Sequence, residues 1–126
     1  MSATMGGRIE NEFVPYEQAL VLKELGFDEP CLGYYTIYSD GEVKLFTSDK
    51  GFRNLEASTF SQAFRWFRER YQIDSWIYPN HNGLYSVSIV RRGVGLGNLS
   101  QYQTYPEAEL SCLIKLIEIT NESKRT

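Results

Sequence analysis

The chain contains one helix-starting phrase three times: PYEQAL at residues 15–20, TFSQAF at 59–64 and TYPEAEL at 104–110. Thr59 with Gln62, and Thr104 with Glu107, have the spacing of a capping box, in which two side chains bond free backbone N–H groups at a helix start. Two hairpin signals, SDG at 39–41 and NHNG at 80–83, lie in the gaps. The pattern predicts an α+β fold of order α-ββ-α-ββ-α, with antiparallel hairpins packed against helices.

Apolar residues at helical spacing indicate the inward face of each predicted helix. The first helix ends at Gly26, which is typical of a left-handed cap. Trp66 lies at the margin of the second stripe and is left open. The expected inward residues are Ala19, Leu20, Leu22 and Leu25 in the first helix; Phe60, Ala63, Phe64, Phe67 and Tyr71 in the second, which starts at Thr59; and Ala108, Cys112, Leu113, Leu116, Ile117 and Thr120 in the third, from Thr104 to Asn121.

The register of the first hairpin follows from the faces on which its apolar residues fall. A two-residue loop at 40–41 would scatter them over both faces. A three-residue loop at 39–41, closed by Gly41 at positive φ, instead sets Ile37 opposite Val43 and Tyr35 opposite Leu45, so that all four share one buried face. The opposite face then carries Tyr34, Thr36, Tyr38, Glu42, Lys44 and Phe46.

The second hairpin is expected to pair residues 74–79 with 84–91. A four-residue loop at 80–83 sets two pairs on the apolar face, Tyr78 with Tyr85 and Trp76 with Val87. Residues 48–58 are expected to form a polar connector, and the glycine-rich residues 93–103 a mobile loop.

The length of 126 residues fits one domain with a real core. We expect a single α+β domain at 13–122, a disordered N-terminal arm at 1–12 and a frayed tail at 123–126. No apolar run approaches the roughly 20 residues that span a bilayer, and the first residues lack the apolar core of a signal peptide. Cys31 and Cys112 have no CxxC spacing, so we expect two buried free thiols in a reducing cytoplasm.

The net charge of −3 is unevenly spread. Residues 1–43 carry −6, residues 44–92 carry +4 and residues 93–126 carry −1. This distribution has two interpretations: a basic patch on an acidic protein, or solvated helix faces that neutralise one another in the fold.

Three stretches are together similar to a known group of proteins: residues 12–20 running on to 26–31, residues 62–69, and residues 105–110 with 113–118. They resemble small uncharacterised proteins encoded by phages, prophages and mobile elements, mainly of Bacteroides-like bacteria. The resemblance covers the three helices and leaves out the segments at 48–58 and 93–98. It implies a phage-encoded accessory protein and supplies no catalytic residues.

Residue types for metal binding and nucleophilic catalysis are sparse. One histidine, His81, and two distant cysteines do not make a common zinc site, and no nucleophile-elbow motif is present. We therefore expect no catalytic residue, no metal and no cofactor, with His81 exposed in a hairpin loop.

The string RRGVGLG at 91–97 has two interpretations. It is either a flexible loop on an edge strand or an anion-binding loop, because glycines admit phosphate oxygens and Arg91 and Arg92 can clamp them. Its glycine spacing, and its distance from the next helix, differ from a dinucleotide fingerprint.

Four residues on the second face of the first hairpin are candidate binding residues: Tyr34, Tyr38, Lys44 and Phe46. Three interpretations stay open. A helix, the N-terminal arm or a second subunit covers this face; or it binds a protein through aromatic anchors; or it stacks the bases of single-stranded nucleic acid. In the last case the contributing cations would be Arg65, Arg68, Arg91 and Arg92, although the overall acidity disfavours strong nonspecific DNA affinity.

These observations favour a cytoplasmic, non-enzymatic interaction module, not associated with a membrane, that binds a protein partner or a second copy of itself. Nucleic-acid binding is the first alternative. Nucleotide or phosphate binding at 91–97 is the second.

Overall fold

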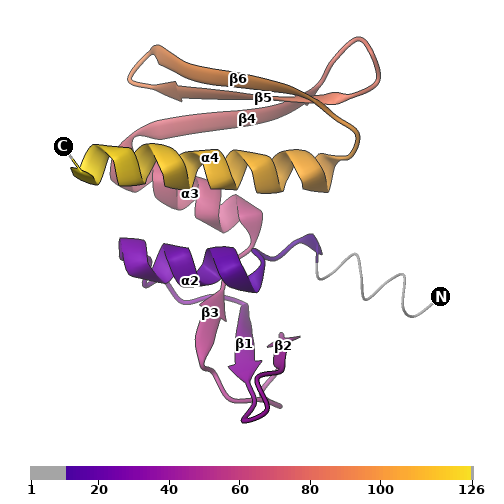
Figure 1. The fold of residues 1–126 in the computed structure, drawn as a ribbon, viewed down its shortest axis with the longest axis vertical. Coiled ribbons are helices and arrows are strands. Elements are labelled where there is room, and N and C mark those ends of the chain that lie inside the picture. The colour runs from indigo at the N-terminus through magenta and orange to yellow at the C-terminus, as the bar shows by residue number, and fades with distance from the viewer. Residues whose placement is uncertain (1–10, 126) are drawn as a thin grey trace. The chain divides into compact units, whose positions relative to one another are not determined.

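The computed structural model describes residues 11–125 and shows three helices and two three-stranded antiparallel sheets in this part of the chain (Figure 1). The predicted α+β class is therefore confirmed. The chain divides into two compact units, unit 1 up to Gln62 and unit 2 from Ala63, which we describe separately. The single domain expected at 13–122 stays a prediction. Residues 1–10 of the expected arm, and Thr126 of the expected tail, lie outside the described residues.

Unit 1 consists of one helix, a three-stranded sheet and the first residues of a second helix. Its elements are α2 (Tyr16–Leu25), β1 (Gly33–Ile37), β2 (Val43–Phe46), β3 (Leu55–Ala57) and the start of α3 (Phe60–Tyr71). The sheet has the order β2-β1-β3, so β3 is an edge strand. As predicted, α2 ends at Gly26 in the left-handed conformation, with φ of 105°. Ala19, Leu22 and Leu25 are buried, whereas Leu20 is 38% exposed and its predicted burial is wrong.

The predicted register of the first hairpin is confirmed. Tyr35 lies opposite Leu45 and Ile37 opposite Val43. Gly41 has a φ of 90° and donates its N–H to the carbonyl of Tyr38 at 2.9 Å, which closes the three-residue loop.

The predicted burial of this hairpin is wrong at its tip. Ile37 is 42% exposed, while Thr36 on the other face is 1% exposed. A helix of ten residues is about 15 Å long, and α2 covers the sheet near Tyr35, whose ring meets Tyr16 edge to face at 5.6 Å. Beyond Tyr35 the hairpin also loses its third strand, because β3 pairs only with Gly33–Tyr35. The pair Ile37–Val43 therefore projects past the elements that would bury it.

The second face of the hairpin is covered by the segment between β2 and β3. Thr36 donates its hydroxyl to the carbonyl of Phe52 at 2.7 Å, and the N–H of Gly51 bonds the hydroxyl of Tyr34 at 3.0 Å. Tyr34 is only 2% exposed as a result. The expected polar connector at 48–58 thus contains the strand β3, and its residues 48–52 cover one face of the sheet.

Unit 2 consists of the rest of α3, a three-stranded sheet and a long helix. Its further elements are β4 (Ile73–Pro79), β5 (Tyr85–Arg91), β6 (Val94–Tyr102) and α4 (Tyr105–Arg125). The sheet has the order β4-β5-β6, and α4 contacts all three strands (Figure 1). All six residues predicted to face inward from α4 are buried. The helix continues to Arg125, beyond its predicted end at about Asn121, and the frayed tail expected at 123–126 stays a prediction.

Both predicted capping boxes have their N-cap hydrogen bond. Thr59 accepts the N–H of Gln62 at 3.1 Å, and Thr104 accepts that of Glu107 at 3.2 Å. On α3, Phe60, Ala63 and Phe67 are buried as predicted, Trp66 is buried as well, and Phe64 and Tyr71 are half-buried.

The predicted register of the second hairpin is wrong by one residue. Tyr78 lies opposite Ser86 and Trp76 opposite Ser88, because the loop has three residues, 81–83, instead of four. Asn80 explains the difference. Its side-chain oxygen accepts hydrogen bonds from the N–H groups of Asn82 and Leu84. Gly83 has a φ of 78° and closes the loop by donating its N–H to the backbone carbonyl of Asn80. The loop therefore has the geometry of the first hairpin, and His81 is exposed in it as expected.

The mobile loop expected at 93–103 is wrong. Arg91 pairs with Val94, and the two residues between them have positive φ, 51° at Arg92 and 81° at Gly93. This is the signature of a type I′ turn, which joins neighbouring antiparallel strands. The following glycines lie in β6.

We expect Gly51→Ala to destabilise unit 1 by about 1–3 kcal/mol, as overpacking does elsewhere. A methyl group at this position would lie 2.8 Å from the ring of Phe46 and would overlap the hydroxyl of Thr36. Gly95→Ala in β6 is the matched control, since nothing lies within 4 Å of the added carbon. Urea unfolding measures both variants. Equal stability of the two would show that residues 48–52 do not rest on the sheet.

Candidate binding cleft in unit 1

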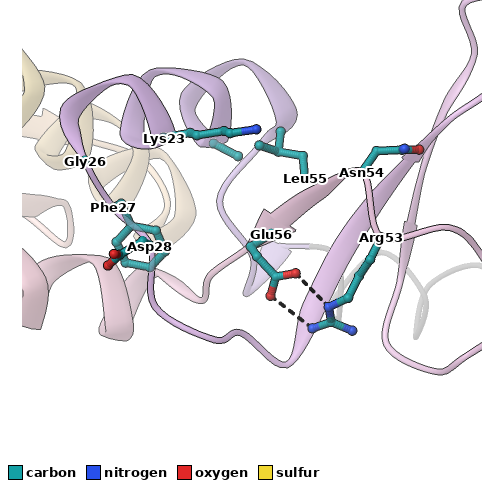
Figure 2. A pocket seen from close by; sticks show the side chains of 9 residues that line it. Lys23, Gly26, Phe27, Asp28, Arg53, Asn54, Leu55 and Glu56 are labelled. Carbon is teal, nitrogen blue, oxygen red and sulfur yellow. Dashed lines mark hydrogen bonds and ion pairs between the residues drawn. The ribbon is translucent and has the colours of Figure 1, made fainter.

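A cleft of about 470 Å³ lies between α2 and the edge strand β3 (Figure 2). Ala19, Phe27 and Leu55 are buried and form its apolar floor. The rim is polar and mostly exposed. It is made by Lys23 of α2, by Gly26 and Asp28 after the helix, and by Arg53, Asn54 and Glu56 beside and on β3.

The wall on the β3 side is held by a bidentate ion pair. The guanidinium of Arg53 donates to the two carboxylate oxygens of Glu56, at 2.6 and 3.0 Å, as the dashed lines in Figure 2 show. Arg53 also donates to the carbonyl of Cys31 at 2.7 Å, while Glu56 accepts the N–H of Cys31 at 3.0 Å. The guanidinium lies 4.6 Å from the centre of the Tyr34 ring. The hydrogen bond to Glu56 raises the pKa of Arg53 above its ordinary value.

Neither cysteine has the properties of a nucleophile. Burial, followed by the charges of Glu56 and Glu29, raises the pKa of Cys31 to about 11. Burial likewise raises the pKa of Cys112 to about 11. Both are free thiols, as expected, but only Cys112 is fully buried, and Cys31 is half-buried. A thiol with so high a pKa is almost entirely protonated at neutral pH, and the thiolate is the reactive form.

Two charged side chains of the cleft have no partner among residues 11–125: the ammonium group of Lys23 and the carboxylate of Asp28. Both are exposed. They contrast with Arg53 and Glu56, which neutralise each other. The rim of the cleft thus carries one positive and one negative charge that are unpaired among residues 11–125.

The candidates on the second face of the first hairpin separate into a covered pair, buried Tyr34 and half-buried Phe46, and an exposed pair. Tyr34 stacks on Phe46, with ring centres 5.8 Å apart, beneath residues 48–52. Tyr38 and Lys44 lie at the exposed tip of the hairpin, with the ammonium group 5.7 Å from the ring centre. The open aromatic surface considered above is therefore reduced to Tyr38 and Lys44.

The predicted arginines all belong to unit 2. Arg65 and Arg68 are exposed on α3, and Arg92 is exposed in the turn between β5 and β6. Arg91 donates to the hydroxyl of Ser123 at 3.0 Å and, with Lys115, lines a shallower depression of about 340 Å³. The glycines of the string at 91–97 lie in a turn and a strand, which is unlike the loop that cradles a phosphate.

Sequence reasoning missed Lys23, Asp28, Arg53 and Glu56 as a group. They come from two segments about thirty residues apart, and nothing in their spacing marks them. Within residues 11–125, no three His, Cys, Asp or Glu residues are placed to share a metal ion. No helix in this range has the length and apolarity needed to cross a bilayer.

No family model, curated protein or solved structure matches this chain.

The raised pKa of Cys31 predicts slow alkylation by iodoacetamide at pH 8, rising about tenfold per pH unit up to pH 10. Glu29→Gln removes one of the carboxylates that raise this pKa, so the variant should react faster at pH 8. Mass spectrometry of the modified peptide separates Cys31 from Cys112, and Glu17→Gln is a remote control. A wild-type rate at pH 8 equal to that of a free cysteine peptide would contradict the burial and charge environment described here.

Proposed function

We propose that this protein is a non-enzymatic interaction module that binds another protein at the unit 1 cleft. One observation carries the proposal: an apolar floor of buried side chains, bordered by a wall that an ion pair and backbone hydrogen bonds hold in place. Binding sites typically combine such an apolar surface with a few fixed polar groups.

Two exposed apolar side chains support a protein partner over a small molecule. Leu32 and Phe52 are each 77% exposed. Leu32 follows Cys31 and Phe52 precedes Arg53 in the chain, and the guanidinium of Arg53 is hydrogen-bonded to the carbonyl of Cys31. Exposed leucine and phenylalanine side chains gain free energy when a partner removes them from water, by about 25 cal/mol per Å². A second copy of the chain is the alternative protein partner.

The resemblance of the three helices to phage- and prophage-encoded proteins supports an accessory role in a bacterial host. In that setting the protein acts in the cytoplasm, and its partner is a host or phage protein.

A second candidate function, nucleic-acid binding, is favoured by unit 2. Trp76 and Tyr78 are 52% and 42% exposed and, being two residues apart on β4, share one face of the strand. Unit 2 has eight basic and six acidic residues, whereas unit 1 has five basic and ten acidic residues. Exposed rings and arginines in one unit are the groups that single-stranded nucleic acid requires.

We expect Leu32→Ser combined with Phe52→Ser to reduce partner binding at least tenfold while changing the melting temperature little, because both side chains are already in water. Val94→Ser is the matched control, since Val94 is 62% exposed in unit 2. Quantitative affinity capture from the source cells compares the recovery of each protein by wild type and variants. A partner lost by the double variant and kept by the control supports the proposal.

Equal recovery by all three proteins would contradict a protein interface that extends from the cleft over Leu32 and Phe52. The nucleic-acid candidate has its own test, in which fluorescence anisotropy follows binding to a single-stranded oligonucleotide. Affinity that falls steeply with salt, and that Trp76→Ser with Tyr78→Ser abolishes, would support nucleic-acid binding instead.

A further inference from the structure

The open edge of β3 borders the cleft. The sheet order β2-β1-β3 leaves one side of Leu55–Ala57 without a strand partner in the described part of unit 1. This open edge ends at Ala57, because Ser58 and Phe60 are hydrogen-bonded to Val14 and Glu12. Leu55 and Glu56 belong to β3 and also line the cleft, together with Arg53 and Asn54 just before it. An extended peptide lying in the cleft would therefore run along an unpaired strand. Strand addition of this kind gives affinity through backbone hydrogen bonds and specificity through alternate side chains.

The helix side of the cleft offers further acceptors. The carbonyls of Leu22 and Lys23 accept the N–H groups of Phe27 and Gly26, which leaves the carbonyls of Glu24 and Leu25 without backbone partners among the described residues. The negative end of the α2 dipole is also here, and the carboxylate of Asp28 follows directly. This end of the cleft favours a cation.

The ammonium group of Lys23 favours an anion. Lys23 lies on the rim and has no ion-pair partner among residues 11–125 (Figure 2). The floor of Ala19, Phe27 and Leu55 accepts an uncharged side chain. In an extended peptide, residues two positions apart point to the same side. One peptide can therefore place an apolar residue on the floor and a charged residue on each side of it.

We infer that the cleft binds an extended peptide segment of the partner, which adds a strand to the edge of β3 and places an apolar side chain on the floor between an acidic residue at Lys23 and a basic residue at Asp28. The inference rests on the proposed function, because it specifies the partner segment at that site.

The test starts from an mRNA-displayed library of random nonapeptides selected against the full chain. We expect the enriched peptides to share a single pattern from N- to C-terminus, either acidic-x-apolar-x-basic or basic-x-apolar-x-acidic. Only one of the two is expected, because the peptide runs along β3 in one direction. A selected peptide carrying photo-leucine at the apolar position should crosslink to Phe27 or Leu55. N-methylation of successive peptide residues should weaken binding at every second position by at least tenfold, because only alternate N–H groups face the neighbouring strand.

A charge-exchange variant tests the assigned polarity. Lys23→Glu with Asp28→Lys should reverse the preference between the selected peptide and its isomer with the two charged residues exchanged. Asp49→Lys with Lys50→Glu is the matched control in the same unit, because both residues are exposed and outside the cleft lining. It should leave the preference unchanged. Circular dichroism confirms that both variants are folded.

The outcomes separate the inference from the function on which it rests. If peptides crosslink to the floor but N-methylation shows no alternation, or the charge exchange does not reverse the preference, the inference is wrong and the cleft remains a protein-binding site. If no selected peptide crosslinks to the floor, the proposed function fails as well.

Discussion

The ion pair between Arg53 and Glu56 is the interaction on which the arrangement of unit 1 depends. Through the N–H and carbonyl of Cys31 it joins the start of β3 to a segment that lies 22 and 25 residues earlier in the chain. An exposed ion pair by itself contributes about 0–1 kcal/mol. This pair is bidentate, both of its groups also bond the backbone, and the guanidinium lies over the ring of Tyr34. Its main effect is positional, because a planar guanidinium with several fixed partners orders the groups around it.

This arrangement determines which surfaces of unit 1 are available. Residues 48–52, ending next to Arg53, lie over Tyr34 and Thr36, and these side chains form a second apolar layer beneath them. The hydroxyl of Tyr34 is bonded to backbone there, so the aromatic ring is buried with its polar atom satisfied. Leu55, opposite Tyr35, faces α2, whereas Glu56, opposite Tyr34, faces the covered side, so the apolar floor and the charged wall meet at the edge of β3. The ion pair of Arg53 and Glu56 thus borders both the covered face and the cleft.

The sequence predicted the features that local chemistry controls. Thr59 and Thr104 cap their helices, Gly26 ends α2 and Gly41 closes the first hairpin, because each of these depends on residues within one turn. The errors have two kinds. In the first kind, the local signal was present but misinterpreted. The side chain of Asn80 makes a three-residue loop in the second hairpin, and the positive φ values of Arg92 and Gly93 make a two-residue turn, where longer loops were expected. In the first hairpin the register was right, but burial depended on residues 48–52, and no local pattern shows where such a segment will fold.

The cleft could not be predicted for the same reason, and its charges show why net charge is a poor guide to a partner. Unit 1 has ten acidic and five basic residues, which taken alone would indicate a basic partner. At the cleft, however, Glu56 is neutralised by Arg53. The charged groups without a partner among residues 11–125 are one ammonium, on Lys23, and one carboxylate, on Asp28. Long-range attraction from the acidic unit is screened within about 8–10 Å at physiological salt. Discrimination between partners therefore depends on the positions of the two unpaired charges, on Lys23 and Asp28, beside the apolar floor. A partner that places a like charge next to either of them loses more binding free energy than it gains from a favourable net charge.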